Sequence, residues 1–307
     1  MRSAIVPLKF SIVTPSLNSQ DFIRETIESV IRQSGDFSIE YIVIDGCSKD
    51  QTGTIVKGYQ RQLLSGKLPI NCKEIKIKFV SEKDSGMYDA INKGFALATG
   101  DIFAWINSDD VYIQGSFNII EKTFSKYPQI IWLKGVTSYI DEASNIYASG
   151  KCFLYQKELI NRGLYGPILY FIQQDSVFWR AQLWNLSGGV DARLSVAGDY
   201  FLWKKFSEIT PLYSLNTNVS CFRKVCGQKS ENIQKYFQEI NDYSGSNRNQ
   251  YKLIKYYFAF EKYIPFFMQP LCYRLFLGKH KYHLVTLDKE MEPRLREGNY
   301  LMLSNIS

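Results

Sequence analysis

The chain has 307 residues, of which 45% are hydrophobic and 22% are charged, and its formal net charge is +7. This composition is typical of a globular protein and excludes a disordered one, and the length allows one large domain with an appendage or two modest domains. The positive charge would suit an anionic partner. We exclude nucleic acid, because no basic stripe is joined to a readout motif.

Over the first 130 residues, apolar runs typical of buried strands alternate with the spacing of amphipathic helices. The expected strands are FSIVTPS, IEYIVIDG, KIKFVSE and DIFAWIN, and the expected helices cover residues 21–33, about 51–64, 87–98 and 116–127. This alternation predicts an α/β fold, with a mainly parallel sheet flanked by helices on both faces. In such sheets a ligand binds beyond the carboxyl ends of the strands.

Each of these four strands ends in polar or turn residues. The ends are Thr14-Pro15-Ser16-Leu17-Asn18, Asp45-Gly46, Ser81-Glu82-Lys83-Asp84 and Asn107-Ser108-Asp109-Asp110. Asp and Asn also favour turns and helix caps, so one such end alone would carry little weight. Four ends at one edge of a parallel sheet predict a site.

Carboxylates at strand ends, without His or Cys nearby, suit a hard divalent cation such as Mg²⁺ or Mn²⁺. Such a cation usually takes one or two protein carboxylates and completes its shell with water and substrate phosphates. The pattern therefore indicates a diphosphate ligand. The glycine-rich phosphate motifs of P-loop kinases and dinucleotide dehydrogenases are missing from the sequence, so we consider neither class further.

Residues 131–230 are less regular, with strand patterns at IIWLKG and SVFWR and helical residues around DYFLWKKF. No Pro- or Ser-rich boundary precedes residue 231. We therefore expect residues 1–230 to form one domain and residues 231–307 to form a helical, basic and aromatic extension.

Three features bear on the compartment. The six cysteines are scattered without a C-x-x-C pair, which fits reduced thiols in a cytoplasmic protein. The N-terminus lacks the charged leader and apolar core of a signal peptide. No stretch approaches the length of apolar sequence that a spanning helix needs. We expect a cytoplasmic protein.

Residues 251–283 carry six Lys or Arg against one Glu, a net charge of +5, and they hold 11 of the 41 Tyr and Phe residues. Basic and aromatic helices of this type lie in the membrane interface, where anionic lipids attract the lysines. The alternative is a helix pair that packs its aromatic face on the preceding domain. The first interpretation predicts peripheral contact with the inner face of the plasma membrane.

Six segments of the chain, in order, resemble the motifs of family 2 glycosyltransferases, which are inverting, nucleotide-sugar-dependent enzymes of the GT-A (Rossmann-like) fold. They are IVTPSLN, EYIVIDGCSKDQT, FVSEKDSGMYDAINKGFALATGDIFAWINSDD, QQDSVFWR, SGGVDARLSVAGDYFLW and FRKVCGQKS. The resemblance spans residues 10 to 230. It implies a nucleotide-sugar half at about residues 1–110 and an acceptor and catalytic half at 111–230.

On the donor side, the resemblance implies roles for individual positions. It places Thr14, Pro15, Ser16 and Asn18 along the nucleotide, Asp45 at the base or ribose, and Asp84 at the nucleotide-sugar, with Asp89 and Lys93 on the next helix. NSDD matches the family's D-x-D-like element, with Asp109 at Mn²⁺ or Mg²⁺ and Asp110 beside the sugar. Asn107 stands where the first acid is common, so we expect Asp109 to carry most of the metal binding.

On the acceptor side, Asp199 takes the place of the family's general base, although it could instead cap the helix that follows. A base of this kind removes the proton of the attacking hydroxyl on the face opposite the leaving group. Gln174 and Asp175 are expected to face the acceptor. The remaining candidates, near the diphosphate, are Arg223, Lys229 and Ser230, with a solvated loop as the alternative because Val225 replaces the common His.

The resulting hypothesis is a metal-dependent inverting glycosyltransferase. Its donor would be a nucleotide-sugar, most simply a UDP-sugar, and its acceptor a saccharide or lipid-linked saccharide in cell-surface polysaccharide or lipid-linked oligosaccharide synthesis. One alternative is a sugar nucleotidyltransferase, but TPSLNSQ lacks the Gly-rich, basic loop that a triphosphate needs. The other is a non-catalytic nucleotide-sugar-binding protein, which the joint presence of Asp109, Asp110 and Asp199 argues against.

Overall fold

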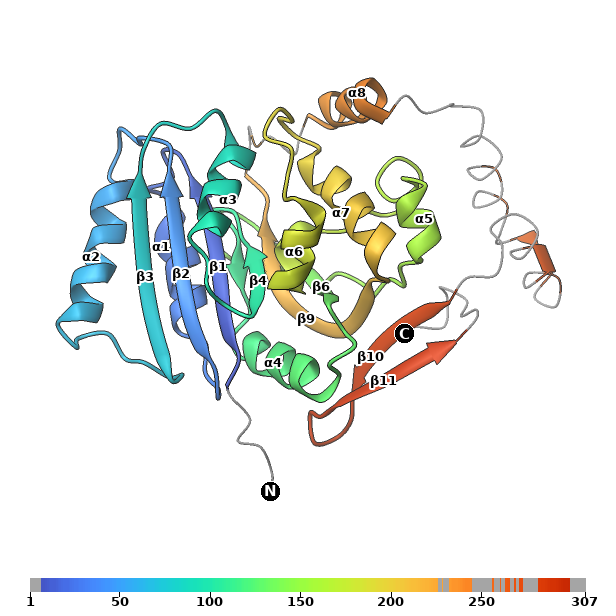
Figure 1. Cartoon of the computed structure of the whole chain (residues 1–307), viewed down its shortest axis with the longest axis horizontal. Coiled ribbons are helices and arrows are strands. Elements are labelled where there is room, and N and C mark those ends of the chain that lie inside the picture. Colours follow the sequence, from blue (N-terminus) through green and yellow to red (C-terminus); the bar gives the residue numbers. More distant parts are fainter. Residues whose placement is uncertain are drawn as a thin grey trace.

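A computed structural model describes residues 7–225, 228, 232–244 and 281–298, together with isolated positions between 256 and 272. One mixed sheet runs through the described part, with the strand order β11-β10-β9-β6-β8-β4-β1-β2-β3 (Figure 1). Helices cover both of its faces. The predicted α/β architecture, a mainly parallel sheet between helices, is confirmed.

The first half of the chain supplies four parallel strands with a helix after each of the first three. The strands are β1 (Lys9–Ser16), β2 (Ser38–Asp45), β3 (Glu74–Ser81) and β4 (Ile102–Trp105), and the helices are α1 (Ile23–Ile31), α2 (Thr52–Leu64) and α3 (Met87–Ala96). β1 and β2 are buried along almost their whole length. Continuous apolar runs of this kind are what parallel strands covered on both faces require.

The second half adds strands of both directions. It contains β5 (Val111–Tyr112), α4 (Ser116–Lys126), β6 (Trp132–Ile140), β7 (Ile146–Ala148), α5 (Lys157–Asn161), the 3₁₀ turn η1 (Gln174–Ser176), β8 (Val177–Arg180), α6 (Ala181–Ser187), α7 (Gly198–Ile209) and β9 (Tyr213–Arg223). β8 is antiparallel to both β4 and β6, while β6 and β9 are parallel. β8 therefore joins the two parallel blocks of the sheet.

Two hydrophobic cores lie on opposite faces of the sheet. The first contains residues of α1, α2 and α4, such as Ile27, Val56 and Phe117. The second contains residues of α3, α5, α6 and α7, including Trp203, whose ring stacks on that of Trp105 at 5.6 Å. α3 and α7, which carry candidate site residues, thus cover the same face.

The C-terminal part is helical only in places. α8 (Ile233–Ser244) is followed, beyond residue 280, by a hairpin of β10 (Tyr282–Leu287) and β11 (Pro293–Gly298). The extension, which was expected to be helical, thus also contains strands, because β10 pairs with β9 and buries Leu284 and Val285. The hairpin also pairs with α4, through an ion pair of 2.6 Å between Lys122 and Glu292.

Most of the basic, aromatic segment 251–283 lies outside the described residues, as do Lys229 and Ser230. At the end of that segment, His283 pairs with Glu297 on β11 at 2.7 Å. No helix in the described part of the chain is long and apolar enough to cross a membrane. The described cysteines are free thiols, at positions 47, 72, 152, 221 and 272.

A buried carboxylate ties the amino-terminal ends of the central strands together. Glu40 on β2 is 1% exposed and accepts hydrogen bonds from Ser11 Oγ (2.6 Å) and Thr99 N (2.7 Å), and it pairs with Lys78 Nζ (2.7 Å). Burial alone would raise the pKa of Glu40, but Lys78, Ser11 and Thr99 together lower it to about 2. The carboxylate is therefore ionised in the folded protein over the whole neutral range.

We expect Glu40→Gln to lower the free energy of unfolding by about 2 kcal/mol at pH 7. Because the folded pKa lies below the unfolded one, this stabilisation is present above the unfolded value of 4.5 and is lost as the pH falls towards 2. Urea unfolding at pH 7 and at pH 3 would measure it. Glu74→Gln, which breaks an exposed pair with Lys76, is the control and should cost less than about 0.5 kcal/mol; equal losses would contradict the prediction.

Candidate active site

The carboxyl ends of β1, β2 and β3 form one row at an edge of the sheet. Ser16 is paired in register with Asp45, and Asp45 with Ser81. β4 joins the same edge, since the amide of Ile106, just after its last residue, donates to Val13 O at 2.9 Å. The predicted meeting of the four strand ends is thus confirmed (Figure 1, upper edge of the sheet).

Asp45 organises the ends of the first three strands. It is 1% exposed and accepts hydrogen bonds from Ser81 Oγ (2.7 Å), Ser16 Oγ (3.3 Å) and the amide of Ser48 (3.0 Å). The Ser48 hydroxyl also donates to it. The carboxylate of Asp45 is therefore surrounded by serine hydroxyl groups at the edge of the sheet.

The end of β1 divides into buried and accessible residues. Thr14 is fully buried and accepts a hydrogen bond from Tyr41 OH (3.1 Å), and Pro15 is also buried. The side chains of these two residues, which were expected along the nucleotide, lie in the core. Asn18 is exposed, with φ 50°, and its Oδ1 accepts from Lys49 N at 2.9 Å, which joins the loop after β1 to the loop after β2.

The loop from β3 to α3 carries the next candidates. Asp84 accepts from Gly86 N at 3.0 Å and lies so close to Gly46 that a Cβ there would stand 2.7 Å from Asp84 Oδ2. Asp84 is thus held beside the end of β2. Asp89 accepts a hydrogen bond from Ser85 N (2.9 Å) and pairs with Lys93 (3.4 Å). Asp89 and Lys93 therefore stabilise this loop.

The NSDD turn, residues 107–110, follows β4 and contains two acids in different surroundings. Asp109 is half-buried, and its Oδ2 accepts from Gln228 Nε2 at 2.8 Å. Asp110 is 0% exposed and accepts from Arg223 N (2.8 Å) and Asn107 Nδ2 (3.3 Å). Burial, together with neighbouring carboxylates, raises the pKa of Asp110 well above its usual range. Asp110, which was expected beside the sugar, is thus buried against the end of β9.

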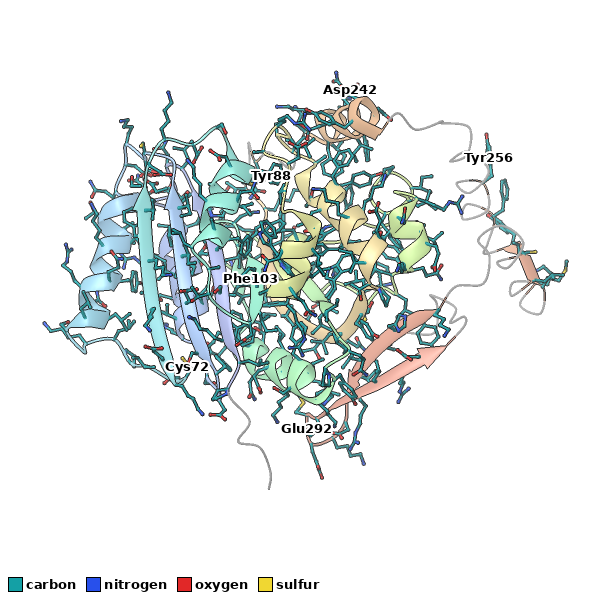
Figure 2. The ribbon with its side chains drawn as sticks, viewed as in Figure 1. Cys72, Tyr88, Phe103, Asp242, Tyr256 and Glu292 are labelled. Atoms are coloured by element: carbon teal, nitrogen blue, oxygen red, sulfur yellow. The ribbon has the colours of Figure 1, made fainter. Side chains whose placement is uncertain are left out.

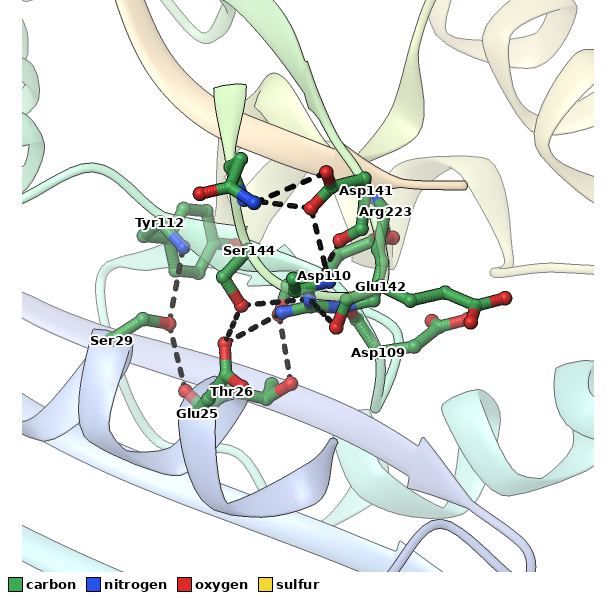
Figure 3. Close-up of polar contacts among 12 residues, drawn as sticks. Glu25, Thr26, Ser29, Asp109, Asp110, Tyr112, Asp141, Glu142, Ser144 and Arg223 are labelled. Atoms are coloured by element: carbon green, nitrogen blue, oxygen red, sulfur yellow. Dashed lines mark hydrogen bonds and ion pairs between the residues drawn. The ribbon is translucent and has the colours of Figure 1, made fainter. Parts of the chain in front are cut away.

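Arg223, at the end of β9, is fully buried, and its guanidinium is used within the protein (Figure 3). Its nitrogens donate to the carboxylate of Glu25 (2.7 Å), the hydroxyl of Ser144 (2.8 Å) and the backbone carbonyls of Asp109 (2.8 Å) and Asp141 (3.0 Å). Arg223 therefore joins α1, the NSDD turn and the β6–β7 turn. Arg223, which was expected near the diphosphate, has its donors occupied within the protein and its side chain away from solvent.

Replacing Arg223 with Met should lower the free energy of unfolding by about 3 kcal/mol, because buried carbonyls and Glu25 would lose their donors. Arg223→Lys should recover only part of this loss, since an ammonium cannot reproduce the planar fork of donors. Urea unfolding would measure both. Lys224→Met changes the exposed neighbour of Arg223 and should cost less than about 0.5 kcal/mol; similar values for the two Met variants would contradict the role of Arg223.

The two predicted acceptor residues lie behind this edge. Asp175 is 1% exposed, accepts from Ser220 Oγ (2.5 Å) and lies near the buried Lys134. Burial raises the pKa of Asp175 and lowers the pKa of Lys134 to about 8. Asp175, which was expected to face the acceptor, is thus buried between β6 and β9. Gln174 donates to Trp105 O and supports the end of β4.

Asp199 is the second residue of α7, whose N-cap is Ala197. Its Oδ1 is buried and lacks a hydrogen-bond partner within the described ranges. Burial raises the pKa of Asp199 to about 7, and the negative charge of Glu239 contributes in the same direction. α7 begins beside α3, where Tyr88 packs against Gly198 (Figure 2 labels Tyr88). A carboxylate of this kind near the donor edge has the properties of a general base at neutral pH.

The NSDD turn also fits a hard cation. Asn107 Oδ1 is buried without a hydrogen-bond partner among the described residues, and Asp109 is half-buried two residues away. One or two protein oxygens suffice for Mg²⁺ or Mn²⁺ when phosphates and water complete the shell. Within the described part of the chain, no group of three or more His, Cys, Asp or Glu side chains could hold a metal by itself.

The sequence model of glycosyl transferase family 2 matches residues 11–186, which is more than half of the chain. The chain belongs to glycosyl transferase family 2. Its relatives include an uncharacterized glycosyltransferase of Rickettsia prowazekii, 27% identical over 217 residues that cover 69% of this chain and 63% of the relative. Chondroitin synthase of Escherichia coli is 25% identical over 263 residues, which cover 85% of this chain but 34% of the synthase.

Two solved structures of similar fold are complexes with nucleotide-sugars. TarS of S. aureus, residues 1–349, in complex with UDP-GlcNAc, has a TM-score of 0.56 at 17% identity and covers 88% of this family 2 chain and 80% of its own. The mannosyltransferase PcManGT of Pyrobaculum calidifontis, in complex with GDP-Man and Mn²⁺, has a TM-score of 0.54 at 16% identity. The match covers 79% of this chain and 66% of the mannosyltransferase. At these identities the likeness shows the fold, a GT-A-like sheet with flanking helices.

Three residues around the site were not predicted from the sequence: Glu25, Gln228 and Glu239. Each forms hydrogen bonds with residues far away in the chain. Glu239, for example, binds the backbone of residues 195–197. Glu25, in the first turn of an amphipathic helix, carries only the general signal that acids favour this position. Only the folded arrangement could identify them.

Proposed function

We propose that this family 2 domain transfers a sugar from a nucleotide-sugar, most simply a UDP-sugar, to an acceptor hydroxyl with inversion at the anomeric carbon. Asp199 carries the proposal: a carboxyl group with a pKa of about 7 and an unpartnered Oδ1 stands next to α3 at the donor edge. Residues 1–110 would form the nucleotide-sugar half and residues 111–230 the acceptor half. These assignments follow the family motifs.

The donor would lie along the ends of β1 to β4. The hydroxyl-ringed Asp45, together with Ser16 and Asn18, would face the nucleoside, and Asp84 would face the sugar-diphosphate part. Asp109 and Asn107 would hold a divalent cation, which, when bound, offsets the charge that develops on the leaving nucleoside diphosphate. The neutral Asn107 leaves one carboxylate for the cation, which favours binding together with the diphosphate rather than before it.

The acceptor hydroxyl would approach Asp199 from the other side of the sugar. As its oxygen forms a bond to the anomeric carbon, its proton passes to the Asp199 carboxylate, and the bond from that carbon to the diphosphate oxygen breaks with its electron pair. The attack and the departure take place on opposite faces, so the configuration inverts. The proton later leaves Asp199 for solvent.

We also propose a saccharide or lipid-linked saccharide as the acceptor, in cell-surface polysaccharide or lipid-linked oligosaccharide synthesis. The similarity to chondroitin synthase supports a saccharide acceptor. A cytoplasmic location with peripheral membrane contact through residues 251–283 accords with the charge of that segment. Sedimentation of the full chain with anionic liposomes at low salt tests the contact, since unbound protein under those conditions would contradict it.

The test of function is a screen of nucleotide-sugars for slow hydrolysis, which needs no acceptor, combined with melting temperatures in UDP or GDP with and without Mn²⁺. We expect UDP with Mn²⁺ to raise Tm and one UDP-sugar to be hydrolysed. Hydrolysis of no donor, with no rise in Tm, would overturn the proposal. Release of pyrophosphate from a nucleoside triphosphate and a sugar phosphate would favour a nucleotidyltransferase, and binding without turnover a non-catalytic protein.

A further inference from the structure

A single carboxylate from α8 binds the loop that leads into Asp199. Glu239 Oε1 accepts hydrogen bonds from the amide (2.7 Å) and the hydroxyl (3.0 Å) of Ser195. Its Oε2 accepts from the amides of Val196 (2.9 Å) and Ala197 (2.6 Å). Three consecutive backbone N–H groups thus converge on one side chain more than 40 residues later in the sequence.

These amides belong to the N-cap residue Ala197 and to the two residues before it, so they lie just ahead of the first turn of α7. α7 has no side-chain cap of its own, because its N-cap residue is Ala197. A carboxylate at a helix N-terminus is also favoured by the helix dipole. Glu239 therefore fixes, from a separate helix, the backbone that leads into α7 and Asp199.

Asp199 is fixed on its other side by α3. Gly198 lies against the ring of Tyr88, where a Cβ would stand 2.6 Å from the Tyr88 Cζ. α8 adds further ring contacts with α7, at 6.5 Å between Tyr200 and Tyr236. The backbone from Ser195 to Asp199 is thus clamped between α3 and α8, and the direction of the Asp199 side chain follows from that clamp.

We propose that Glu239 is a positioning residue for Asp199, so that α8, although it lies outside the segment matched by the family, completes the catalytic half of the domain. This inference rests on the proposed function, in which Asp199 takes the acceptor proton. It also places the boundary of the functional unit beyond residue 230. Domains cut at that position would lose the clamp.

The charge of Glu239 gives the proposal a specific readout. The titratable groups that face Asp199 from neighbouring elements are Tyr88 on α3, and Tyr236 and Glu239 on α8. Burial raises the pKa of both tyrosines, so they stay neutral. Burial would raise the pKa of Glu239 too, but its backbone hydrogen bonds lower it, so Glu239 is ionised at neutral pH. Removing this charge should therefore lower the pKa of Asp199.

The experiment compares Glu239→Gln with the full-length wild-type protein in hydrolysis of the donor that the screen identifies, from pH 5.5 to pH 9. We expect kcat to fall about 10- to 100-fold, as for a catalytic group displaced by about 1 Å, with KM for the donor nearly unchanged. The acid limb of the kcat profile should move to lower pH. Asp242→Asn, the same change of charge on an exposed residue of α8 (labelled in Figure 2), should alter neither.

Two further variants separate the outcomes. Glu239→Asp keeps the charge but shortens the reach, so kcat should fall while the acid limb stays in place. Combining Glu239→Gln with Asp199→Asn should cost no more than Asp199→Asn alone, because both changes act on one group. The inference would be overturned if Glu239→Gln and Glu239→Asp had the same kcat and the same pH profile as Asp242→Asn. Absence of turnover in the wild-type protein would instead overturn the proposed function, and a UDP-induced rise in Tm shows that each variant is folded.

Discussion

Asp199→Asn is expected to lower kcat by about 10²- to 10⁴-fold, the range that general-base catalysis contributes. Asn is almost isosteric with Asp but cannot accept the proton of the attacking hydroxyl. In the proposed site the donor contacts the strand ends and not α7, so the rise in Tm with UDP and Mn²⁺ should remain. Steady-state kinetics and melting curves on the same preparation measure both. Loss of the Tm response in this variant would remove Asp199 from the role of base.

The pH dependence adds a second measurement of the same residue. Activity of the wild-type protein should rise with pH through about 7, because Asp199 must lose its proton before it can act as a base. Its folded pKa lies above the unfolded value of 3.8, so the folded protein holds this proton more tightly, and ionising Asp199 reduces stability as the pH rises between these values. Asp199→Asn should therefore be relatively more stable than wild type at pH 8 than at pH 5.

A control for this pair of measurements lies in the same loop. Asp191 is paired with the exposed Arg193 at 2.6 Å, so Asp191→Asn removes a negative charge without touching the site. Its kcat and acid limb should match those of the wild type. An acid limb that persists unchanged in a residual activity of Asp199→Asn would assign the titration to another group.

The sequence predicted the first four strands well because each is an apolar run that ends in polar residues, and parallel strands covered on both faces require such runs. β9 and the β10–β11 hairpin were missed for a different reason. β9 gains its buried surface from β6, about 80 residues earlier in the chain, and β10 pairs in turn with β9. Short alternating segments of this kind show their partners only in the folded chain.

Within the candidate site, sequence patterns identified the segments at the edge of the sheet but not how deeply each residue of a segment is buried. Asp109 and Asp110 are adjacent acids with identical local signals, and only burial under Arg223 distinguishes them. Thr14 was expected along the nucleotide and Asp175 facing the acceptor, and both side chains are buried. A motif specifies which segment reaches the edge of the sheet. Which atoms of that segment face the ligand depends on packing from distant elements.

This distinction between the two acids leads to the second large effect. Asp109→Asn should abolish the Mn²⁺-dependent part of the Tm rise with UDP and lower kcat by about 10²- to 10³-fold, the cost of losing one main stabiliser of developing charge. The reason is that Asn107 already supplies a neutral oxygen, so a second amide would leave the proposed cation without its carboxylate ligand. Melting temperatures with UDP, with and without Mn²⁺, measure the binding part directly.

Asp110→Asn is the matched comparison, because it is the same substitution one residue later. The buried carboxyl of Asp110 has a raised pKa, and an amide oxygen can still accept the hydrogen bond from Arg223 N. The Asp110→Asn protein should therefore fold and keep its response to Mn²⁺. If Asp110→Asn lost that response while Asp109→Asn retained it, the two roles would be reversed. The buried position of Asp110 would then have to change when the donor binds.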